Sequence, residues 1–300
     1  MQSMAPLWDY LLAVLIPQAL DGMIIASALI LVAVGLTMIF GLLHVINLAH
    51  GELYMLGAYG AYAMTTAGAP FWVALIMSPL LVGTLGVFIE RFGIRPLVGR
   101  KDHGVLTLLL TFGLGLMLRD MAQFAWGAET RSVRAPVTGA LVWGDIAVSN
   151  YRLMIFFVAL LVIASVWWVV HRTLAGAVLR AAAHDGEMVA ALGVPVTRVQ
   201  TITFFACSAL AALSGVLLAP IYAVFPGMGH DFILLAFAVV IVGGMGSVLG
   251  VVLAGVLLAQ VHSLGSLIIR PVWAETLVFA VMIGVLVFRP HGMFGRPGND

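Results

Sequence analysis

Apolar segments of about 20 residues follow one another along nearly the whole chain of 300 residues, and this pattern limits what the chain can fold into. An α-helix needs about 20 apolar residues to cross a bilayer. Hydrophobic residues make up 63% of the sequence and charged residues only 9%, too few to cover a soluble globule of this size. The sequence therefore predicts an all-α, polytopic membrane protein, with a single transmembrane domain over residues 1–300.

The apolar segments predict membrane crossings at 10–42, 44–66, 71–90, 104–126, 152–171, 199–222, 231–269 and 272–288. The segment 231–269 is too long for one crossing. It contains Gly243, Gly244 and Gly246, and such a cluster of glycines favours a break. Eight or nine transmembrane helices follow, some of them broken, depending on whether this break is a kink, a re-entrant turn or a full loop.

Positively charged side chains indicate the orientation in the membrane. They are gathered after the third and fifth segments and at the end of the chain: Arg91, Arg95, Arg100, Lys101, Arg172, Arg180, Arg198, Arg289 and Arg296. The positive-inside rule makes these ends cytoplasmic. Arginines at 119, 131, 134 and 152 flank the opposite loop and weaken this bias. With the N-terminus outside and the C-terminus inside, the parity favours nine crossings. No Lys or Arg precedes Arg91, so the first segment is not expected to be a cleaved signal peptide.

One apolar segment carries a cluster of polar residues, His44, Asn47, His50 and Glu52. A charged side chain at the centre of a membrane helix costs roughly 2.5–3.5 kcal/mol, so burial against protein or a water-filled pathway must compensate it. We expect Asn47, His50, Gly51 and Glu52 to fix a helix break in the wall of a translocation path. Gly243, Gly244 and Gly246 predict a second break, and we consider whether the two breaks are equivalent in two halves of the molecule.

Outside that cluster, the apolar segments carry few ionisable groups, chiefly Asp21, His262 and Glu275. None of these forms an evident acid and base pair that would hold both charges of an amino acid. The translocation path is therefore expected to be largely apolar and to contribute little affinity.

The loop 172–198 contains the signals of a short helix. Asp185 is a good N-cap, Glu187 suits the positive end of a helix, Gly193 is placed for a C-cap, and Pro195 prevents continuation. These residues delimit a two-turn helix at 186–192.

Met188 and Leu192 lie four residues apart and give this short helix an apolar stripe, flanked by Ala191 and Val189. Two turns are not stable alone in water, because the cost of nucleation is not recovered. The helix must therefore pack either on the ends of its own transmembrane helices or against a cytoplasmic partner.

The loop 127–150 is rich in β-branched residues and turn formers, which predicts a small hairpin on the outer face. This segment is either a connector or a docking surface.

Several function classes are excluded by what the sequence lacks. No His-Glu-x-x-His pair, zinc-ligand spacing or Gly-x-Ser-x-Gly elbow is present, so neither a catalytic nor a metal site is expected. The lone Cys207 excludes an intramolecular disulfide, and the net charge of +1 argues against a nucleic-acid partner. The only lysine, Lys101, follows Arg100, so a phosphate-binding loop is absent and any ATP must bind to another chain.

Four stretches of the sequence resemble the permease subunits of branched-chain amino-acid ABC transporters of the LivH type. They are residues 35–59 (GLTMIFGLLHVINLAHGELYMLGAY), 179–185 (LRAAAHD) leading to 190–194 (AALGV), 238–250 (AVVIVGGMGSVLG) and 286–295 (LVFRPHGMFG). They occur in the order of the family and span essentially the whole chain.

This resemblance implies a subunit of an importer in the bacterial cytoplasmic (inner) membrane. It implies as partners a second related permease, two cytoplasmic ATPases that bind ATP and Mg, and an external substrate-binding protein, with transport by alternating access. Residues 184–194 resemble the loop that couples to the ATPase, so the expected coupling residues are Asp185, Glu187, Met188, Ala191, Leu192 and Gly193. Arg131 and Arg134 in the outer loop are the candidates for docking the binding protein.

The resemblance does not fix the substrate, which is an amino acid or a related small polar or organic-acid solute. An alternative from another class is an ion-coupled carrier or a passive channel that uses His44, Asn47, His50 and Glu52. Such a protein has no need of a delimited cytoplasmic helix, and genes for an ATPase and a binding protein next to this one would favour the importer.

Overall fold

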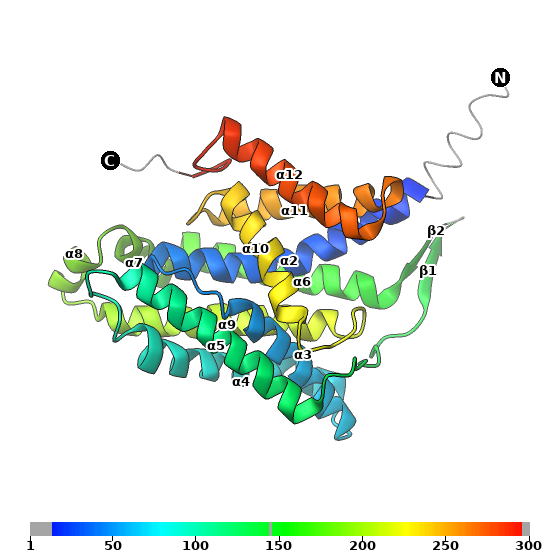
Figure 1. Cartoon of the computed structure of the whole chain (residues 1–300), viewed down its shortest axis with the longest axis horizontal. Coiled ribbons are helices and arrows are strands. Elements are labelled where there is room, and N and C mark those ends of the chain that lie inside the picture. The colour runs from blue at the N-terminus through cyan, green and yellow to red at the C-terminus, as the bar shows by residue number, and fades with distance from the viewer. Residues whose placement is uncertain (1–13, 144–145, 296–300) are drawn as a thin grey trace.

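The structure, a computed structural model, describes residues 14–143 and 146–295. It is a helical bundle with one small hairpin (Figure 1). In chain order its elements are α2 (Ile16–Leu43), α3 (His50–Thr66), α4 (Phe71–Phe88), the π-helix η2 (Ile89–Ile94), α5 (His103–Trp126), β1 (Ala140–Trp143), β2 (Ile146–Ser149), α6 (Asn150–Arg172), α7 (Leu174–His184), α8 (Gly186–Ala191), α9 (Val196–Leu218), α10 (Met228–Gly243), α11 (Val248–Ile268) and α12 (Pro271–Phe288).

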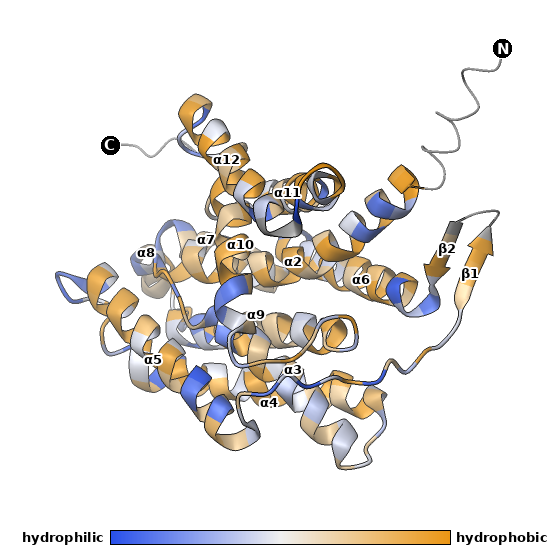
Figure 2. Cartoon of the chain, turned by 45° about the vertical axis from the view of Figure 1, so that its right-hand side comes forward, coloured by the Kyte–Doolittle hydropathy of each residue, from blue (hydrophilic) through white to orange (hydrophobic). Residues whose placement is uncertain are grey.

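Helices of membrane-crossing length account for most of the described chain. Six apolar helical segments are long enough to cross a bilayer: 16–43, 71–94, 103–126, 150–172, 196–218 and 248–268. Helices α10 and α12 are shorter and apolar, and α3 has 17 residues. Hydrophobic residues cover most of these helices, whereas hydrophilic ones gather near the connections (Figure 2). These features confirm the all-α, polytopic membrane fold. Residues 10–13 of the first predicted segment and Arg296 lie outside the described residues.

The long helices run back and forth between two ends of the bundle. Helix α2 begins at the end that carries β1 and β2, and α12 ends near the opposite end, where α7 and α8 lie (Figure 1). The segment 231–269 is divided by residues 244–247 into two complete helices, α10 and α11. The described residues thus hold six helical segments of crossing length together with the shorter helices α3, α10 and α12, and the predicted number of crossings, eight or nine, stays a prediction. The assignment of the α8 end to the cytoplasm stays a prediction.

Two groups of four helices pack in equivalent ways. Helix α4 packs along α9, and in the same way α11 packs along α2. Helix α3 contacts both α4 and α5, and α10 likewise contacts both α11 and α12. In this arrangement α2 corresponds to α9 and α3 to α10. The connection between α2 and α3 is therefore equivalent to the one between α9 and α10. The interpretation that the breaks near Asn47 and Gly243 are equivalent is wrong, because the glycine break lies between α10 and α11.

The two groups meet in a tightly packed centre formed by α2, α3 and α9. A side chain at Gly57 would overlap the backbone of Ala212, and one at Gly215 would overlap the backbone of Tyr54. These glycines let the backbones of α3 and α9 touch. The hydroxyl of Ser214 donates a hydrogen bond to the carbonyl of Ala28 at 2.8 Å, which joins α9 to α2.

An ion pair with a buried carboxylate follows α4, and Thr201 connects it to α9. Arg95 donates from Nε to Oε1 of Glu90 at 2.8 Å and from Nη2 to Oε2 at 2.7 Å, and the Glu90 side chain is 1% exposed. Thr201 of α9 donates to the same carboxylate at 3.1 Å. The π-helix η2 places Glu90 and Arg95 five residues apart so that they meet.

Candidate functional site

The predicted loop 172–198 is largely helical. Helix α7, which was not predicted, precedes α8. Thr173 is its N-cap, and the hydroxyl oxygen of Thr173 accepts a hydrogen bond from the backbone N–H of Gly176 at 3.1 Å. A side chain at Gly176 would overlap the carbonyl groups of Val169 and Val170, so this glycine allows α7 to fold back on the end of α6. The helices α7 and α8 therefore form a compact unit at one end of the bundle (Figure 1).

Helix α8 has the caps that the sequence predicts. Oδ1 of Asp185 accepts a hydrogen bond from the N–H of Met188 at 2.9 Å, and Glu187 lies in the first turn. Gly193 has φ of +85° and its N–H donates to the carbonyl of Ala190 at 2.9 Å. The helix ends at Ala191, one residue earlier than predicted, with Leu192 as its C-cap.

One side of α8 is buried against the chain and the other side is exposed. Val189 is buried against Leu42 of α2 and Ala182 of α7. Met188 and Leu192 point away from the chain and are 60% and 76% exposed. The inner side therefore rests on the chain's own helices, as one alternative expected, while the predicted apolar stripe stays uncovered.

The polar break begins where α2 ends. His44 adopts φ of +52°, and its N–H donates to the carbonyl of Phe40 at 2.8 Å, which closes the last turn of α2. The chain then turns back toward the middle of the bundle, where α3 begins (Figure 1). Asn47 is fully buried and its Oδ1 accepts from the N–H of Ala49 at 3.1 Å. Thr111 of α5 completes the break, because its hydroxyl lies 3.2 Å from both the N–H of Leu48 and the carbonyl of Ile46.

His50 and Glu52 lie in the first turn of α3 and are buried. Nε2 of His50 lies 3.3 Å from the carbonyl of Val32, next to Gly35, which leaves room for the ring. Glu52 lies beside Gly229 at the start of α10, and its carboxylate is placed at the positive end of α3. The atoms Nδ1 of His50 and Oε2 of Glu52 have no hydrogen-bond partner among the described residues. A break therefore separates α2 from α3, with Asn47 inside it and His50, Gly51 and Glu52 in the first turn of α3, and the role of these residues in the wall of a translocation path stays a prediction.

The second break, at residues 244–247, is held by two distant parts of the chain. The N–H of Gly246 donates to the hydroxyl of Thr37 in α2 at 2.9 Å. The carbonyls of Val242 and Gly243 at the end of α10 accept hydrogen bonds from Met293 at 2.7 Å and Phe294 at 3.2 Å. The motif at 286–295 therefore satisfies the free carbonyls of α10, a role that the sequence alone did not reveal.

Gly244 explains why the glycines are needed at this break. Its φ is +97°, and a side chain there would overlap the backbone of Gly295. Gly243 is equally close to the backbone of Gly250, whereas Gly246 has φ of +84°. Gly243 and Gly244 thus form a close crossing of α10, α11 and the C-terminal segment, whereas Gly246 provides the positive φ of the turn.

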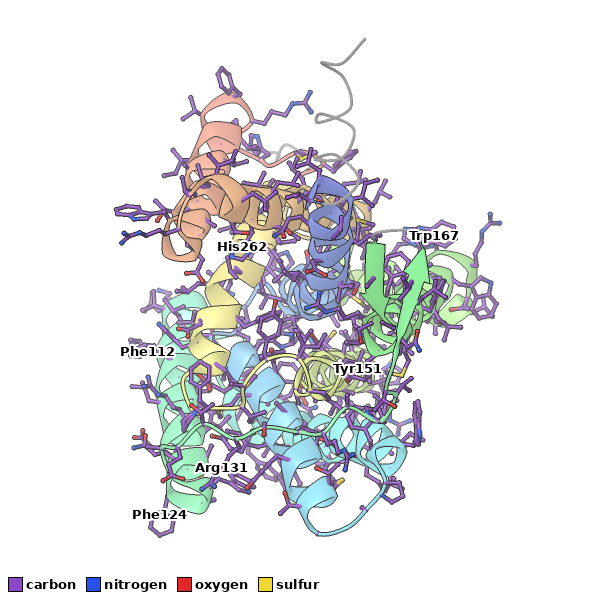
Figure 3. The ribbon with its side chains drawn as sticks, turned by 90° about the vertical axis from the view of Figure 1, so that its right-hand side faces the viewer. Phe112, Phe124, Arg131, Tyr151, Trp167 and His262 are labelled. Carbon is purple, nitrogen blue, oxygen red and sulfur yellow. The ribbon has the colours of Figure 1, made fainter. Side chains whose placement is uncertain are left out.

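A cavity of about 190 Å³ lies between α2, α3, α10, α11 and α12. Its apolar wall also carries polar side chains, namely Tyr54, Tyr222, Asp231, His262 and Glu275. His262 of α11 lies beside α10 (Figure 3). His262, Glu275 and Asp231 line this same cavity, although no ion pair joins any two of them among the described residues. Asp231 was missed, although it is the only acidic residue between 188 and 274. Asp21 lies elsewhere, paired with Arg152.

The outer loop forms the predicted hairpin, in which β1 and β2 are antiparallel. Both the backbone and the side chain of Arg131 make contacts within the chain. Its backbone pairs with Val224 through two hydrogen bonds of 2.8 Å, Nη2 donates to the carbonyl of Trp126 at 3.1 Å, and the guanidinium lies 5.9 Å from the ring centre of Tyr62. Arg134 is exposed. Docking at these two arginines stays a prediction, and Arg134 is the freer of the two.

Among the described residues, no group of three or more His, Cys, Asp or Glu side chains is placed to hold a metal ion.

The comparisons with known proteins agree with these features. A family model described as "Branched-chain amino acid transport system / permease component" matches residues 18–286. The high-affinity branched-chain amino acid transport system permease protein BraD of Pseudomonas aeruginosa is 30% identical, over 93% of this chain and 95% of its own. The corresponding protein LivH of Escherichia coli is 28% identical with the same coverage.

A relative with another named substrate is also similar. The autoinducer 2 import system permease protein LsrC of Photorhabdus luminescens is 28% identical, over 88% of this chain and 78% of its own. No solved structure matches. The chain belongs to the branched-chain amino acid transport system permease family, and it is a multi-pass permease subunit of an ABC importer rather than an enzyme.

Proposed function

We propose that this chain is one of two related permease subunits of an ATP-driven, binding-protein-dependent importer in the cytoplasmic membrane of a bacterium. Two cytoplasmic ATPases bind ATP and Mg, and an external binding protein delivers the substrate. The single observation that carries this proposal is the uncovered apolar side of α8, with Met188 and Leu192 largely exposed at one end of the bundle.

An exposed apolar pair on a six-residue helix indicates a partner. The caps at Asp185 and Gly193 and the buried Val189 hold the helix without help from Met188 or Leu192. These two side chains are therefore free to enter an apolar pocket of another protein, as the anchors of many interfaces do. In this proposal the pocket belongs to an ATPase.

A movement of α8 has a direct route into the membrane domain. Val189 shares a buried apolar cluster with Ala182 of α7 and with Leu42 of α2, which lies two residues before His44 and the polar break. The break in turn contacts α5 through Thr111 and α10 through Glu52 and Gly229. ATP-driven closure of the ATPases thus moves the start of α3 relative to α5 and α10, which provides the change in access.

The outer end of the bundle offers the contact for the binding protein. The hairpin β1–β2 lies there, and Arg134 is exposed in the connection that leads to it. We propose that this connection and the hairpin dock the binding protein.

The names of the relatives support a substrate class. BraD and LivH are named for branched-chain amino acids, and LsrC for autoinducer 2. We propose a branched-chain amino acid or a related small polar or organic-acid solute. An ion-coupled carrier or passive channel is the weaker alternative, because His50 and Asn47 contact the chain's own backbone and thereby hold the break.

The test is purification with the ATPases and the second permease, followed by measurement of ATP hydrolysis in proteoliposomes. The proposal expects loaded binding protein to stimulate hydrolysis, and the stimulation to be lost when the binding protein is omitted. Transport by this chain alone, driven by an ion gradient without ATP, would establish the carrier instead.

A further inference from the structure

An apolar groove of about 480 Å³ lies between α6, α7 and α9, at the same end of the bundle as α8. Its walls are almost wholly apolar and include Val162, Val166 and Val169 of α6, Leu179 of α7, and Ile202 and Leu210 of α9. Val169 and Ile202 are 43% and 69% exposed, so the groove opens to the outside of the bundle. It is separate from the cavity that His262 lines.

The size and lining of the groove favour a hydrocarbon occupant. An engineered apolar cavity of about 150 Å³ stays dry and binds benzene, and this groove is roughly three times larger. Because α6 and α9 cross the membrane, the apolar molecules that reach the groove are the acyl chains of lipids.

Two arginines lie on the same helix faces as residues that line the groove. Arg172 follows Val169 by three residues on α6, and Arg198 precedes Ile202 by four residues on α9. Residues at these spacings share a helix face. Both arginines are exposed, and neither forms an ion pair with an acidic side chain of the described residues. The first turn of α9 has no side-chain cap, so its amide groups add positive potential at the same level.

Aromatic residues mark this level as the membrane interface. Trp167 and Trp168 at the end of α6 are 41% and 58% exposed, and Trp167 lies at the outer margin of the bundle (Figure 3). Exposed tryptophans are typical of the boundary between hydrocarbon and head groups. The groove therefore extends from this boundary toward the hydrocarbon, and the arginines lie on the head-group side.

We propose that the groove is a binding site for an anionic phospholipid, with one acyl chain between α6 and α9 and its phosphate between Arg172 and Arg198. Basic pockets between membrane helices on the cytoplasmic side are suited to such head groups. Net positive charge at the groove end, without an acidic partner, selects an anionic lipid over a zwitterionic one.

The site has a direct connection to α8. Leu179 lines the groove and also packs against the cluster of Leu42, Ala182 and Val189. A bound acyl chain thus contacts α7 at a residue that also packs against the cluster holding α8. Occupancy of the groove therefore holds α8 in position.

The experiment measures lipid retention by native mass spectrometry. The protein is purified with whatever subunits remain bound, exchanged into mixed micelles with equal phosphatidylglycerol and phosphatidylcholine, and then delipidated stepwise. The wild type is expected to retain phosphatidylglycerol. The double variant Arg172→Gln/Arg198→Gln should bind it about thirtyfold more weakly, which corresponds to about 2 kcal/mol at about 1 kcal/mol for each charge. The matched control is Arg100→Gln/Lys101→Gln, which removes two exposed cations away from the groove and should retain the lipid.

A second variant tests the acyl chain separately. Ala206 lines the groove and is exposed, so Ala206→Phe fills it without changing charge. Loss of retention in this variant as well supports the site. Equal retention of both lipids by the wild type, or retention of phosphatidylglycerol unchanged in both groove variants, overturns the proposal. So does a cross-link that shows another subunit covering Ile202 in the assembled transporter.

Discussion

Oδ1 of Asp185 accepts a hydrogen bond from the backbone N–H of Met188 at 2.9 Å, so the cap of α8 and its first exposed apolar residue form one unit. The cap fixes the start of the helix, and the helix fixes the direction of the Met188 side chain. This relationship makes the orientation of the exposed stripe sensitive to Asp185.

Replacement of Asp185 tests this relationship. Asp185→Ala removes the cap, which costs about 1 kcal/mol, whereas Asp185→Asn keeps a side-chain oxygen at the same place. We expect faster amide hydrogen exchange in residues 186–192 and reduced ATP-driven transport for the alanine variant only. Equal exchange in the two variants would show that the buried Val189 alone holds the helix.

The contact between Gly51 and α10 makes a prediction about packing. A side chain at Gly51 would lie 2.6 Å from Cβ of Ile233 and would overlap the carbonyl of Gly229. Gly51→Ala should destabilise the protein by about 1–3 kcal/mol, the usual cost of overpacking, and lower its unfolding temperature in detergent. Gly113 of α5 has no atom within 4 Å of such a side chain and serves as the control. Gly113→Ala should leave the temperature unchanged or raise it slightly, and equal effects of the two changes would contradict the close packing of α3 on α10.

Glu52 is expected to position the wall of the path rather than to recognise the substrate. It is 5% exposed in the first turn of α3 and lies against Gly229. Glu52→Gln keeps the size of the side chain and removes the charge that the helix end favours. Assembly or transport rate should fall, while the order in which solutes compete for uptake stays the same. A changed order in competition assays would make Glu52 a recognition residue.

The ion pair between Glu90 and Arg95 lies near the start of α9, and its removal is expected to lower the stability of the protein. Glu90→Gln removes the charged acceptor of the Arg95 guanidinium and should cost about 1–3 kcal/mol, because the carboxylate is buried while the guanidinium left behind is 32% exposed. Glu129→Gln is the control, since Glu129 is 81% exposed in its pair with Arg131 and such pairs contribute less than about 1 kcal/mol. Thermal unfolding of the two variants in the same detergent measures the difference. A similar shift for both would mean that the Glu90 pair is effectively solvated.

Local signals in the sequence predicted the elements that depend on local physics. The caps at Asp185 and Gly193, the end of α2 at His44 and the break after Gly243 all follow from side chains or glycines at those positions. Helix α7 was missed because its 11 residues are too few for a membrane crossing, although their sequence, LAGAVLRAAAH, is rich in helix-forming alanine and leucine. Its place against the end of α6 depends on the close approach at Gly176.

Contacts between distant parts of the chain could not be predicted from sequence patterns. Thr111, Thr37 and Met293 lie far from the breaks that they hold, and none carries a local signal for this role. The same limit explains why His262, Asp231 and Glu275 were not expected in one cavity. Their helices α11, α10 and α12 come together only through the packing of the second group of helices.

The most direct test of the central claim replaces the exposed stripe of α8. Met188→Asp/Leu192→Asp places two charges where the proposed ATPase contact is apolar, and an unpaired buried charge there costs several kcal/mol. The matched control Met188→Leu/Leu192→Met keeps both volume and polarity. We measure copurification with the ATPase and ATP-driven uptake in proteoliposomes, with membrane insertion checked for each variant. The aspartate variant should insert normally but lose both the ATPase and uptake, while the control retains both. Copurification and uptake at the wild-type level in the aspartate variant would contradict the claim that α8 couples this permease to its ATPase.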